Sequence, residues 1–272
     1  MRYAAFYLFL CMSLGFSHSS LADTIVRLTL PKANSIEPEI TSRFYEKTLR
    51  LAMAKTSHES ERIEFDYHPI AVNRERARLL VKQGVLDIIW SSSNKKREEE
   101  LVAVKFNLLR GINEYRLLLI RADDQPTFDQ VKTLADLQKL RIGSGTHWSD
   151  TDIYRFNGLP LMTSYAYDPM FRMLSVKRFD YMARSIQEVN YELEHYGKLG
   201  LTIEKNLAIH YPQPIYFFVK DSDLAIRIQQ GLEIAQHDGS LDTLFFSIPN
   251  FHQAWEQLQQ LNRRVIELQV PD

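Results

Sequence analysis

The sequence predicts an α/β protein with two lobes, each a mostly parallel sheet flanked by helices. Short apolar runs typical of strands alternate with segments of helical periodicity, the pattern of parallel sheets covered on both faces. The chain has 272 residues, a length that fits one large lobe or two smaller ones, each able to bury a core. No proline- or glycine-rich linker separates two independent halves. We therefore expect the chain to cross between the lobes twice, through strands.

The N-terminus has the pattern of a cleaved signal peptide. Arg2 precedes an almost wholly apolar stretch over 3–16, and residues 17–22 are small and polar. Ser20-Leu21-Ala22 fits a small-x-small cleavage site, so we expect cleavage after Ala22 and a periplasmic mature protein. The apolar run is shorter than the roughly 20 residues that span a bilayer. An uncleaved anchor or a buried N-terminal helix fits the length and flanks less well.

Composition excludes several classes of function. Cys11, the single cysteine, lies inside the apolar run, so the mature chain is expected to have no disulfide, thiolate nucleophile or cysteine-ligated metal. A formal net charge of -1 argues against a nucleic-acid partner. We find no phosphate-binding glycine loop, nucleophile elbow or histidine pair at metal spacing. We therefore predict no cofactor, no metal and no enzymatic activity.

The first half of the mature chain alternates strands and helices. Apolar residues recur at helical spacing from Ile40 to Met53, and a second predicted helix, over 73–83, runs into Gly84, a residue suited to follow a helix end. Pro31 stops the first strand. The strands are expected at 24–30, 62–67, 86–90 and 114–121.

The second half repeats this rhythm. Strands are expected at 141–143, 178–182, 207–211 and 215–220. Helix starts are predicted at Thr133, at Ser149 or Asp150, at Asp168-Pro169, at Ser185 with Glu188 as a capping box, at Asp221 or Ser222, at Ser240 and at Asn250.

Two stretches resemble a known family. The first is Gly84 to Ser93, followed by Arg97-Glu98 and by Tyr115 to Ile120. The second combines Tyr216 to Asp221, Gly231-Leu232 and Asp238 to Leu241. In order and spacing they are similar to the family 3 extracellular solute-binding proteins, the amino-acid-type receptors of ABC importers, which have the type II periplasmic binding fold.

The resemblance implies a division into lobes and a mode of action. Residues 23–117 and 214–272 would form the first lobe, and residues 118–213 the second. A small ligand would dock between them, and hinge closure would exclude water. The sequence departs from the family in two ways. The serine-rich turn after the strand at 86–90 looks shorter, and an arginine, Arg184, stands where family members often carry an acid or a small residue.

Ligands of open α/β sheets bind beyond the carboxyl ends of the strands. That rule places residues 90–93, 143–148 and 182–185 near one cleft. The resemblance adds Arg97 as the carboxylate-binding arginine, and Asp180 on the strand that carries the family's ammonium-binding acid. The candidate ligand-binding residues are Trp90, Ser91, Ser92, Arg97, Ser144, Thr146, His147, Trp148, Asp180 and Arg184.

Alternative roles stay open for the charged and hydroxyl candidates. Arg97 lies in a charge run over 95–100 and can equally be a solvated charge. Residues 144–146 can form an anion cradle or a plain strand-to-helix turn. Arg184 can bind an anion or form a salt bridge with Asp180 or Glu188.

The ring-bearing candidates have a structural alternative too. Trp90 can form a wall of the cleft or belong to the core. Trp148 can stack on a ligand and His147 can donate to it, or both can pack between helix and sheet.

The predicted function is capture of a small polar, carboxylate-bearing ligand for an ABC-type importer, with a membrane permease as partner. One alternative is a ligand-sensing subunit for a membrane receptor or kinase. The other is a small-molecule enzyme on the same fold, similar to cyclohexadienyl dehydratases.

Overall fold

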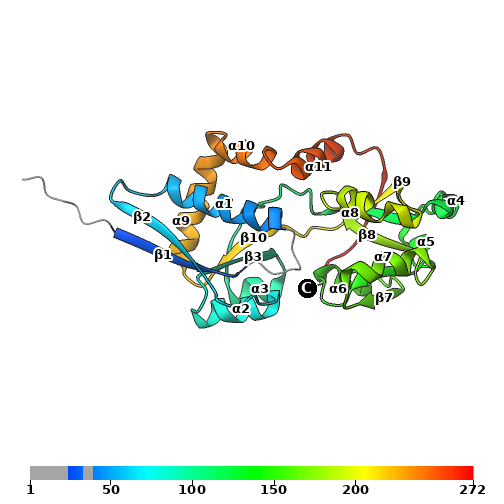
Figure 1. Ribbon diagram of the computed structural model, residues 1–272, viewed down its shortest axis with the longest axis horizontal. Coiled ribbons are helices and arrows are strands. Elements are labelled where there is room, and N and C mark those ends of the chain that lie inside the picture. The colour runs from blue at the N-terminus through cyan, green and yellow to red at the C-terminus, as the bar shows by residue number, and fades with distance from the viewer. Residues whose placement is uncertain (1–23, 33–38, 272) are drawn as a thin grey trace, which may run out of the picture.

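The computed structural model describes residues 24–32 and 39–271, and the chain forms two lobes placed end to end along its long axis (Figure 1). The predicted signal peptide, residues 1–22 with Cys11, lies outside the described residues. In the described part of the chain, no helix has the length and apolar character needed to cross a membrane.

Two small sheets form the first lobe. β1 pairs in parallel with β2, and β10 lies antiparallel between β3 and β4. The Thr29 N–H donates to the Asp87 carboxylate at 2.6 Å, and the Asp87 N–H donates back to the Thr29 carbonyl at 3.0 Å, which joins the two sheets. The strands are β1 (Thr24–Leu30), β2 (Glu61–Tyr67), β3 (Ile88–Ser92), β4 (Val102–Val104) and β10 (Ile215–Val219).

Six helices of the described residues belong to this lobe. α1 packs against α9 so closely that a Cβ at Gly231 would lie 2.0 Å from the Ala52 carbonyl oxygen, so only glycine fits there. α2 and α3 lie on the side of the β3–β10 pair shown at the bottom of Figure 1. The helices are α1 (Glu39–Lys55), α2 (Arg74–Gln83), α3 (Lys95–Glu100), α9 (Ser222–His237), α10 (Ser240–Phe246) and α11 (Pro249–Gln259).

The second lobe contains one six-stranded sheet in the order β11-β9-β5-β8-β6-β7. β6 is parallel to β7 and β8, and β9 is parallel to β11, whereas β5 is antiparallel to both of its neighbours. The strands are β5 (Tyr115–Arg121), β6 (Ile142–Gly145), β7 (Leu161–Ser164), β8 (Tyr181–Ser185), β9 (Leu201–His210) and β11 (Arg264–Glu267).

Short helices cover both faces of this sheet. Alternate residues of β5 point to opposite faces: Leu117 and Leu119 join one buried cluster with α7 residues, while Leu118 and Ile120 join another with α6 residues. The helices are α4 (Gln125–Phe128), α5 (Leu134–Leu137), α6 (Ser149–Phe156), α7 (Tyr167–Ser175) and α8 (Val189–Tyr196).

The chain passes between the lobes three times in its described part. It passes through residues 105–114 and 211–214, and then returns after α11 to add β11 to the second lobe. The assignment of all of 214–272 to the first lobe is therefore corrected for the C-terminal strand. Burial explains the difference, since Ile266 and Leu268 fill the core of the second lobe. Likewise the whole of β5, from Tyr115 onward, pairs within the second-lobe sheet, although the expected boundary was residue 117.

Several predicted helix starts are confirmed. Gly84 ends α2 in the left-handed conformation with φ 74°, Thr133 and Asp136 form a capping box, and the Asp221 side chain caps α9. These helix boundaries depend only on neighbouring residues, which is why the sequence reveals them.

Other predicted starts are wrong. Ser149 and Asp150 lie inside α6, after the N-cap Trp148, and α7 begins at Tyr167 rather than after Asp168. The capping box of Ser185 with Glu188 does not form. Instead β8 runs to Ser185, because its ladder with β5 continues to that residue.

Candidate ligand-binding site

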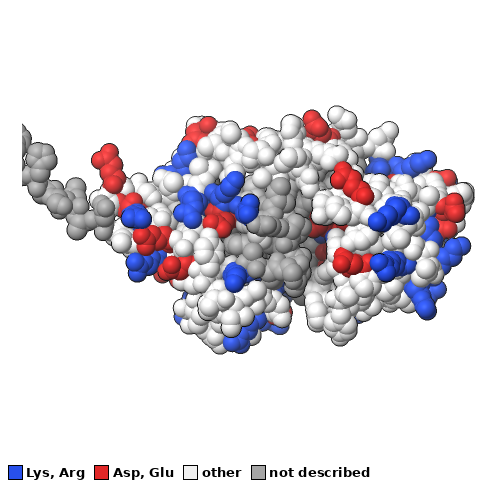
Figure 2. All heavy atoms as spheres, viewed as in Figure 1, with Lys and Arg blue, Asp and Glu red and all other residues white. Residues whose placement is uncertain are grey.

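The cleft edge of each lobe is defined by strand ends. In the first lobe, β3 ends at Ser92 and β10 begins at Ile215, directly opposite in the ladder. In the second lobe, β6 and β8 end at Gly145 and Ser185, while β5 enters the sheet at Tyr115. Figure 2 shows a notch between the two lobes at the lower edge of the view. Side chains at these strand ends are in position to meet a ligand held between the lobes.

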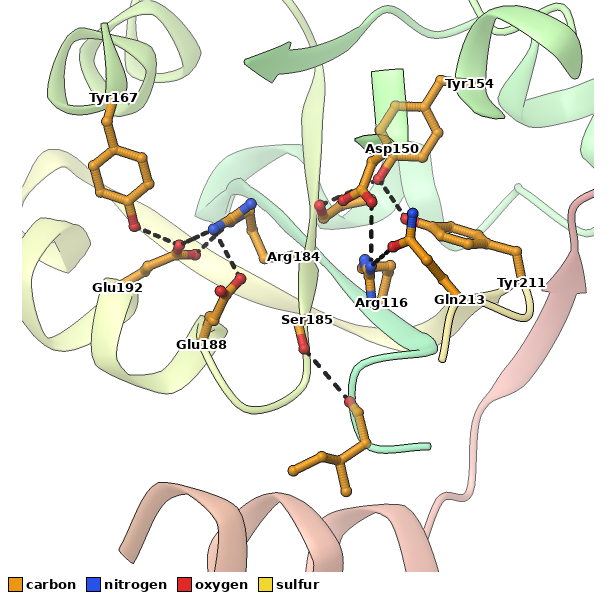
Figure 3. Close-up of polar contacts among 12 residues, drawn as sticks. Arg116, Asp150, Tyr154, Tyr167, Arg184, Ser185, Glu188, Glu192, Tyr211 and Gln213 are labelled. Atoms are coloured by element: carbon orange, nitrogen blue, oxygen red, sulfur yellow. Dashed lines mark hydrogen bonds and ion pairs between the residues drawn. The ribbon is translucent and has the colours of Figure 1, made fainter. Parts of the chain in front are cut away.

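Arg184 lies at the centre of an ion-pair cluster with two carboxylates. Its Nε donates to both carboxylate oxygens of Glu192, at 2.8 and 3.0 Å, and its Nη2 donates to Glu188 at 2.9 Å. The Tyr167 hydroxyl donates to the same Glu192 carboxylate at 2.6 Å (Figure 3). The side chains of Arg184 and Glu192 are 7% and 1% exposed, so this is a buried, bidentate pair.

Aromatic rings enclose the Arg184 guanidinium. Its carbon lies 4.3 Å from the Trp148 ring centroid and 5.9 Å from that of Tyr167. Trp148 reaches this position by lying flat over Gly145, where a Cβ would come within 2.4 Å of the indole. Burial and the Glu192 charge raise the pKa of Tyr167 well above its usual value. Of the two roles expected for Arg184, the structure shows the salt bridge, and the partner is Glu188 together with Glu192.

Glu188 differs from Glu192 in its access to solvent. Its side chain is 35% exposed, and one oxygen binds Arg184. Burial raises the pKa of Glu188, which the positive charge of Arg184 only partly offsets. Glu188 thus offers a partly accessible carboxylate at the cleft edge, which can accept a hydrogen bond from a cationic or neutral donor.

Arg116 lies on the other face of the same sheet edge and is only partly paired. Its Nη2 donates to Gln213 at 2.9 Å and lies 3.3 Å from the Asp150 carboxylate, and its guanidinium carbon is 4.8 Å from the Tyr211 ring centroid (Figure 3). Arg116 is 4% exposed, and its Nε and Nη1 have no partner among the described residues. Burial raises the pKa of Asp150, but Arg116 outweighs it and holds that pKa below its usual value.

The Arg116 cluster also joins the two main crossings. The Gln213 amide donates to the Ser149 hydroxyl at 3.0 Å, and the Asn113 amide donates to the Gln213 carbonyl oxygen. Asn113 belongs to the first crossing, Gln213 to the second, and Ser149 to the start of α6. The cluster therefore lies where the lobes are connected.

Arg97 is the charged residue of the first-lobe edge. Its side chain is 8% exposed, which excludes the alternative of a solvated charge. Its Nη1 donates to the Ser92 carbonyl, and a Glu75 oxygen lies 4.0 Å from Nη2. Burial lowers the pKa of Arg97. The Nε of Arg97 and the hydroxyl of Ser91 have no partner in the part of the chain that the structure describes.

The remaining candidates fall into two groups. Trp90 is half-buried in the middle of β3, and its ring centroid lies 5.5 Å from that of Tyr45. The buried Thr146 hydroxyl has no partner in the described ranges and so resembles Ser91. By contrast, the Ser144 hydroxyl is bonded to Thr151 at 2.8 Å, and His147 is exposed beside Tyr165.

The structure does not bring Asp180 to this edge. Its carboxylate accepts from the Arg141 N–H at 2.7 Å and lies 3.5 Å from Arg121. Asp180 precedes β8, whereas Arg184 is near its end, so the two are separated by roughly 13 Å of extended strand. Its contacts are those of a residue that fixes the opposite end of the sheet.

Sequence reasoning missed Arg116, Asp150, Gln213, Glu188 and Glu192 as site residues. One signal was present, because Arg116 is the only charge in the apolar run from Tyr115 to Ile120. A buried strand keeps a charge only where a partner or a ligand compensates its desolvation. Gln213, 97 residues away in sequence, left no comparable signal.

Comparison with known proteins confirms the fold. No protein-family model and no curated protein matches the sequence. Many solved structures match most of it, among them the following three. A histidine kinase sensor domain with similarity to periplasmic binding proteins has a TM-score of 0.57 and 16% identity, covering 84% of this chain and 96% of that chain.

The other two are binding proteins. An ancestral amino-acid-binding protein, a precursor of cyclohexadienyl dehydratase, has a TM-score of 0.57 and 14% identity, covering 82% of this chain and 94% of that one. The substrate-binding protein of an amino acid ABC transporter has a TM-score of 0.54 and 11% identity, covering 82% and 99%. The chain thus has the type II periplasmic-binding-protein fold predicted from its sequence.

Proposed function

We propose that this protein is a periplasmic solute-binding protein that captures a small carboxylate-bearing ligand between its lobes and delivers it to an ABC-type importer. One observation carries the proposal. Buried donors without a partner among the described residues occur at the cleft edges of both lobes, in Ser91 and Arg97 of the first and in Thr146 and Arg116 of the second.

Unpaired buried donors are costly, which supports a ligand that supplies acceptors. Each buried polar group left unsatisfied costs about 1–3 kcal/mol. A carboxylate offers roughly four acceptor sites and can receive two parallel hydrogen bonds from a guanidinium. Closure would remove water around these contacts and strengthen them.

An amino group on the ligand would complete the match. Glu188 provides a partly exposed carboxylate beside the Arg184 cluster, at the edge that also holds Thr146 and Arg116. In this scheme the ligand carboxylate binds Arg97 and Ser91, and closure brings the ammonium to Glu188. Two of the structures with this fold are amino-acid-binding proteins, which agrees with such a ligand.

A sensory role is the second candidate, because a histidine kinase sensor domain has the same fold. In that role the closed form would be recognised by a receptor or kinase rather than by a permease. Genes beside the coding gene separate the two: a permease gene supports import and a membrane kinase gene supports sensing.

A thermal-shift screen tests the proposal. The mature protein, residues 23–272, is screened against amino acids, organic acids, peptides and oligosaccharides. A ligand at a hundred times its Kd stabilises the protein by about 2.7 kcal/mol, which for this size raises Tm by roughly 5–10 °C. No shift with any compound contradicts the proposal, and chemical conversion of the bound compound, followed by mass spectrometry, supports the enzyme alternative.

Arg97→Ala tests the first-lobe contact. We expect this variant to reduce the ligand-induced shift to near zero, because the bidentate contact is lost. The exposed neighbour Lys96 provides the matched control, and Lys96→Ala should keep the full shift. An Arg97→Ala protein that binds like the wild type removes Arg97 from the site.

A further inference from the structure

The two arginines at the second-lobe edge differ in how many donors are already used. Arg184 binds two carboxylates through Nε and Nη2. Arg116 uses Nη2 alone for both of its contacts, of which the Asp150 contact is long at 3.3 Å and the Gln213 contact is to a neutral oxygen. A charge-assisted N–H···O bond is commonly about 2.7–2.9 Å long.

Arg116 therefore retains most of its hydrogen-bonding capacity. Of the five N–H donors of a guanidinium, Nε carries one and Nη1 carries two. Both atoms are buried and lack a partner among the described residues. Arg116 itself is 4% exposed, so solvent at the surface does not satisfy them.

The position of Arg116 fits a ligand contact. It lies at the second residue of β5, just after the first crossing, and Gln213 lies in the second crossing. Figure 3 shows the Arg116 guanidinium between Asp150 and Gln213. Because Gln213 belongs to a hinge segment, movement of the hinge changes how this residue covers Arg116.

An equivalent feature exists in the opposite lobe. Arg97 is also buried, is also bonded mainly through its Nη atoms, and also leaves Nε without a partner in the described chain. Each lobe thus presents one buried guanidinium with free donors at the cleft edge. A ligand with a single carboxylate satisfies only one of them.

We propose that the ligand is a dicarboxylate, with one carboxylate bound by Arg97 and the other by Arg116. This inference rests on the proposed function and specifies its substrate class. Arg184, by contrast, positions Glu188 and does not contact the ligand's acid groups. An amino dicarboxylate would use Glu188 as well, and a simple dicarboxylate would not.

Matched pairs of compounds test the inference without any mutation. Isothermal titration measures Kd for L-glutamate and L-glutamine, L-aspartate and L-asparagine, and succinate and succinamate. Within at least one pair, we expect the diacid to bind tenfold or more tightly than its monoamide. Equal affinity within every pair overturns the inference.

Arg116→Gln then tests the residue. In this variant we expect the ratio of the monoamide Kd to the diacid Kd to fall to near one, while the Kd for the monoamide changes less than threefold. Arg121→Gln is the matched control, since Arg121 is a buried arginine at the far end of the same strand, bonded to the Leu174 and Phe179 carbonyls. This control should keep the preference.

The outcomes separate the inference from the proposed function. If Arg116→Gln does not fold, Arg116→Lys keeps the charge, and a reduced preference in that variant still supports a bidentate contact. Binding of monocarboxylates as tightly as diacids refutes the dicarboxylate inference alone. Failure of every compound to bind refutes the proposed function as well.

Discussion

Arg116 and Arg184 lie close together in space but differ in how their donors are paired. In the ladder between β5 and β8, Arg116 pairs with Ser185 and Leu117 pairs with Arg184. Since successive side chains alternate between faces, the two arginines lie on opposite faces of one sheet edge. Both are nearly fully buried, yet Arg184 binds two carboxylates through Nε and Nη2, whereas Arg116 uses Nη2 alone and leaves Nε and Nη1 without a partner among the described residues. Burial and charge alone therefore do not distinguish these two arginines, whereas the pairing of their donors does.

Breaking the pair of Arg184 and Glu192 should have the largest effect on stability. Glu192→Ala leaves Arg184 without its bidentate partner in a buried site, and we expect a loss of about 3–5 kcal/mol in the free energy of unfolding. Urea denaturation measures it. Glu194 is exposed on the same helix, and Glu194→Ala should stay within about 0.5 kcal/mol of the wild type. A loss below 1 kcal/mol for Glu192→Ala would show that the cluster contributes little.

Breaking the pair of Arg116 and Asp150 should reduce stability by a smaller amount, and this reduction should depend on pH. The folded state lowers the pKa of Asp150, so the ionised carboxylate contributes stability above the unfolded-state pKa of about 3.9. That contribution is lost as pH falls through the folded-state pKa. Asp150→Asn should therefore destabilise the protein at pH 7, by about 1–3 kcal/mol, and the difference from the wild type should shrink in acid.

The control for this prediction lies two residues along α6. Asp152 is 74% exposed and pairs with Arg155 on the surface, so Asp152→Asn should change stability little at any pH. Unfolding curves at pH 3, 5 and 7 compare the two variants. A pH-independent difference for Asp150→Asn would contradict the pairing with Arg116.

Glu188 should show the opposite pH dependence, with a smaller amplitude. Its pKa is raised in the folded state, so ionisation disfavours folding. The contribution of Glu188 to the free energy of unfolding should accordingly be highest below the unfolded-state pKa of about 4.3 and decline as pH rises through the folded-state value. Glu188→Gln should remove that decline, and the same pH series measures it. A decline that persists in the variant would assign it to another group.

The sequence predicted local features well where one element decides them. β1 occupies the predicted residues 24–30, and Gly84 follows α2 as expected. The capping box at Ser185 and Glu188 failed for the opposite reason. A local pattern favoured a helix start, but pairing of β8 with β5, some 70 residues earlier in the chain, continues the strand to Ser185.

The site was predictable only in part, because some of its contacts join residues that are far apart in the sequence. Ser91 and Thr146 lie near strand ends, so topology located them, and the family resemblance added Arg97. The salt bridge of Arg184 with Glu188 was one of two expected roles. The partners of Arg116 come from two separate segments, namely the start of α6 and the second crossing, and Asn113 of the first crossing holds Gln213 in turn. These residues come together only in the folded chain, and no spacing in the sequence indicates that they are in contact.

The return of β11 to the second lobe has a practical and a mechanical consequence. Three backbone tethers, rather than two, join the halves at separate points, so relative twisting is restrained and bending about a single axis is favoured. β11 is also an edge strand of the second-lobe sheet, and Ile266 and Leu268 pack in the core of that lobe. A purification tag or fluorescent fusion is therefore better placed at the mature N-terminus than at the C-terminus, where it would disturb the packing of β11.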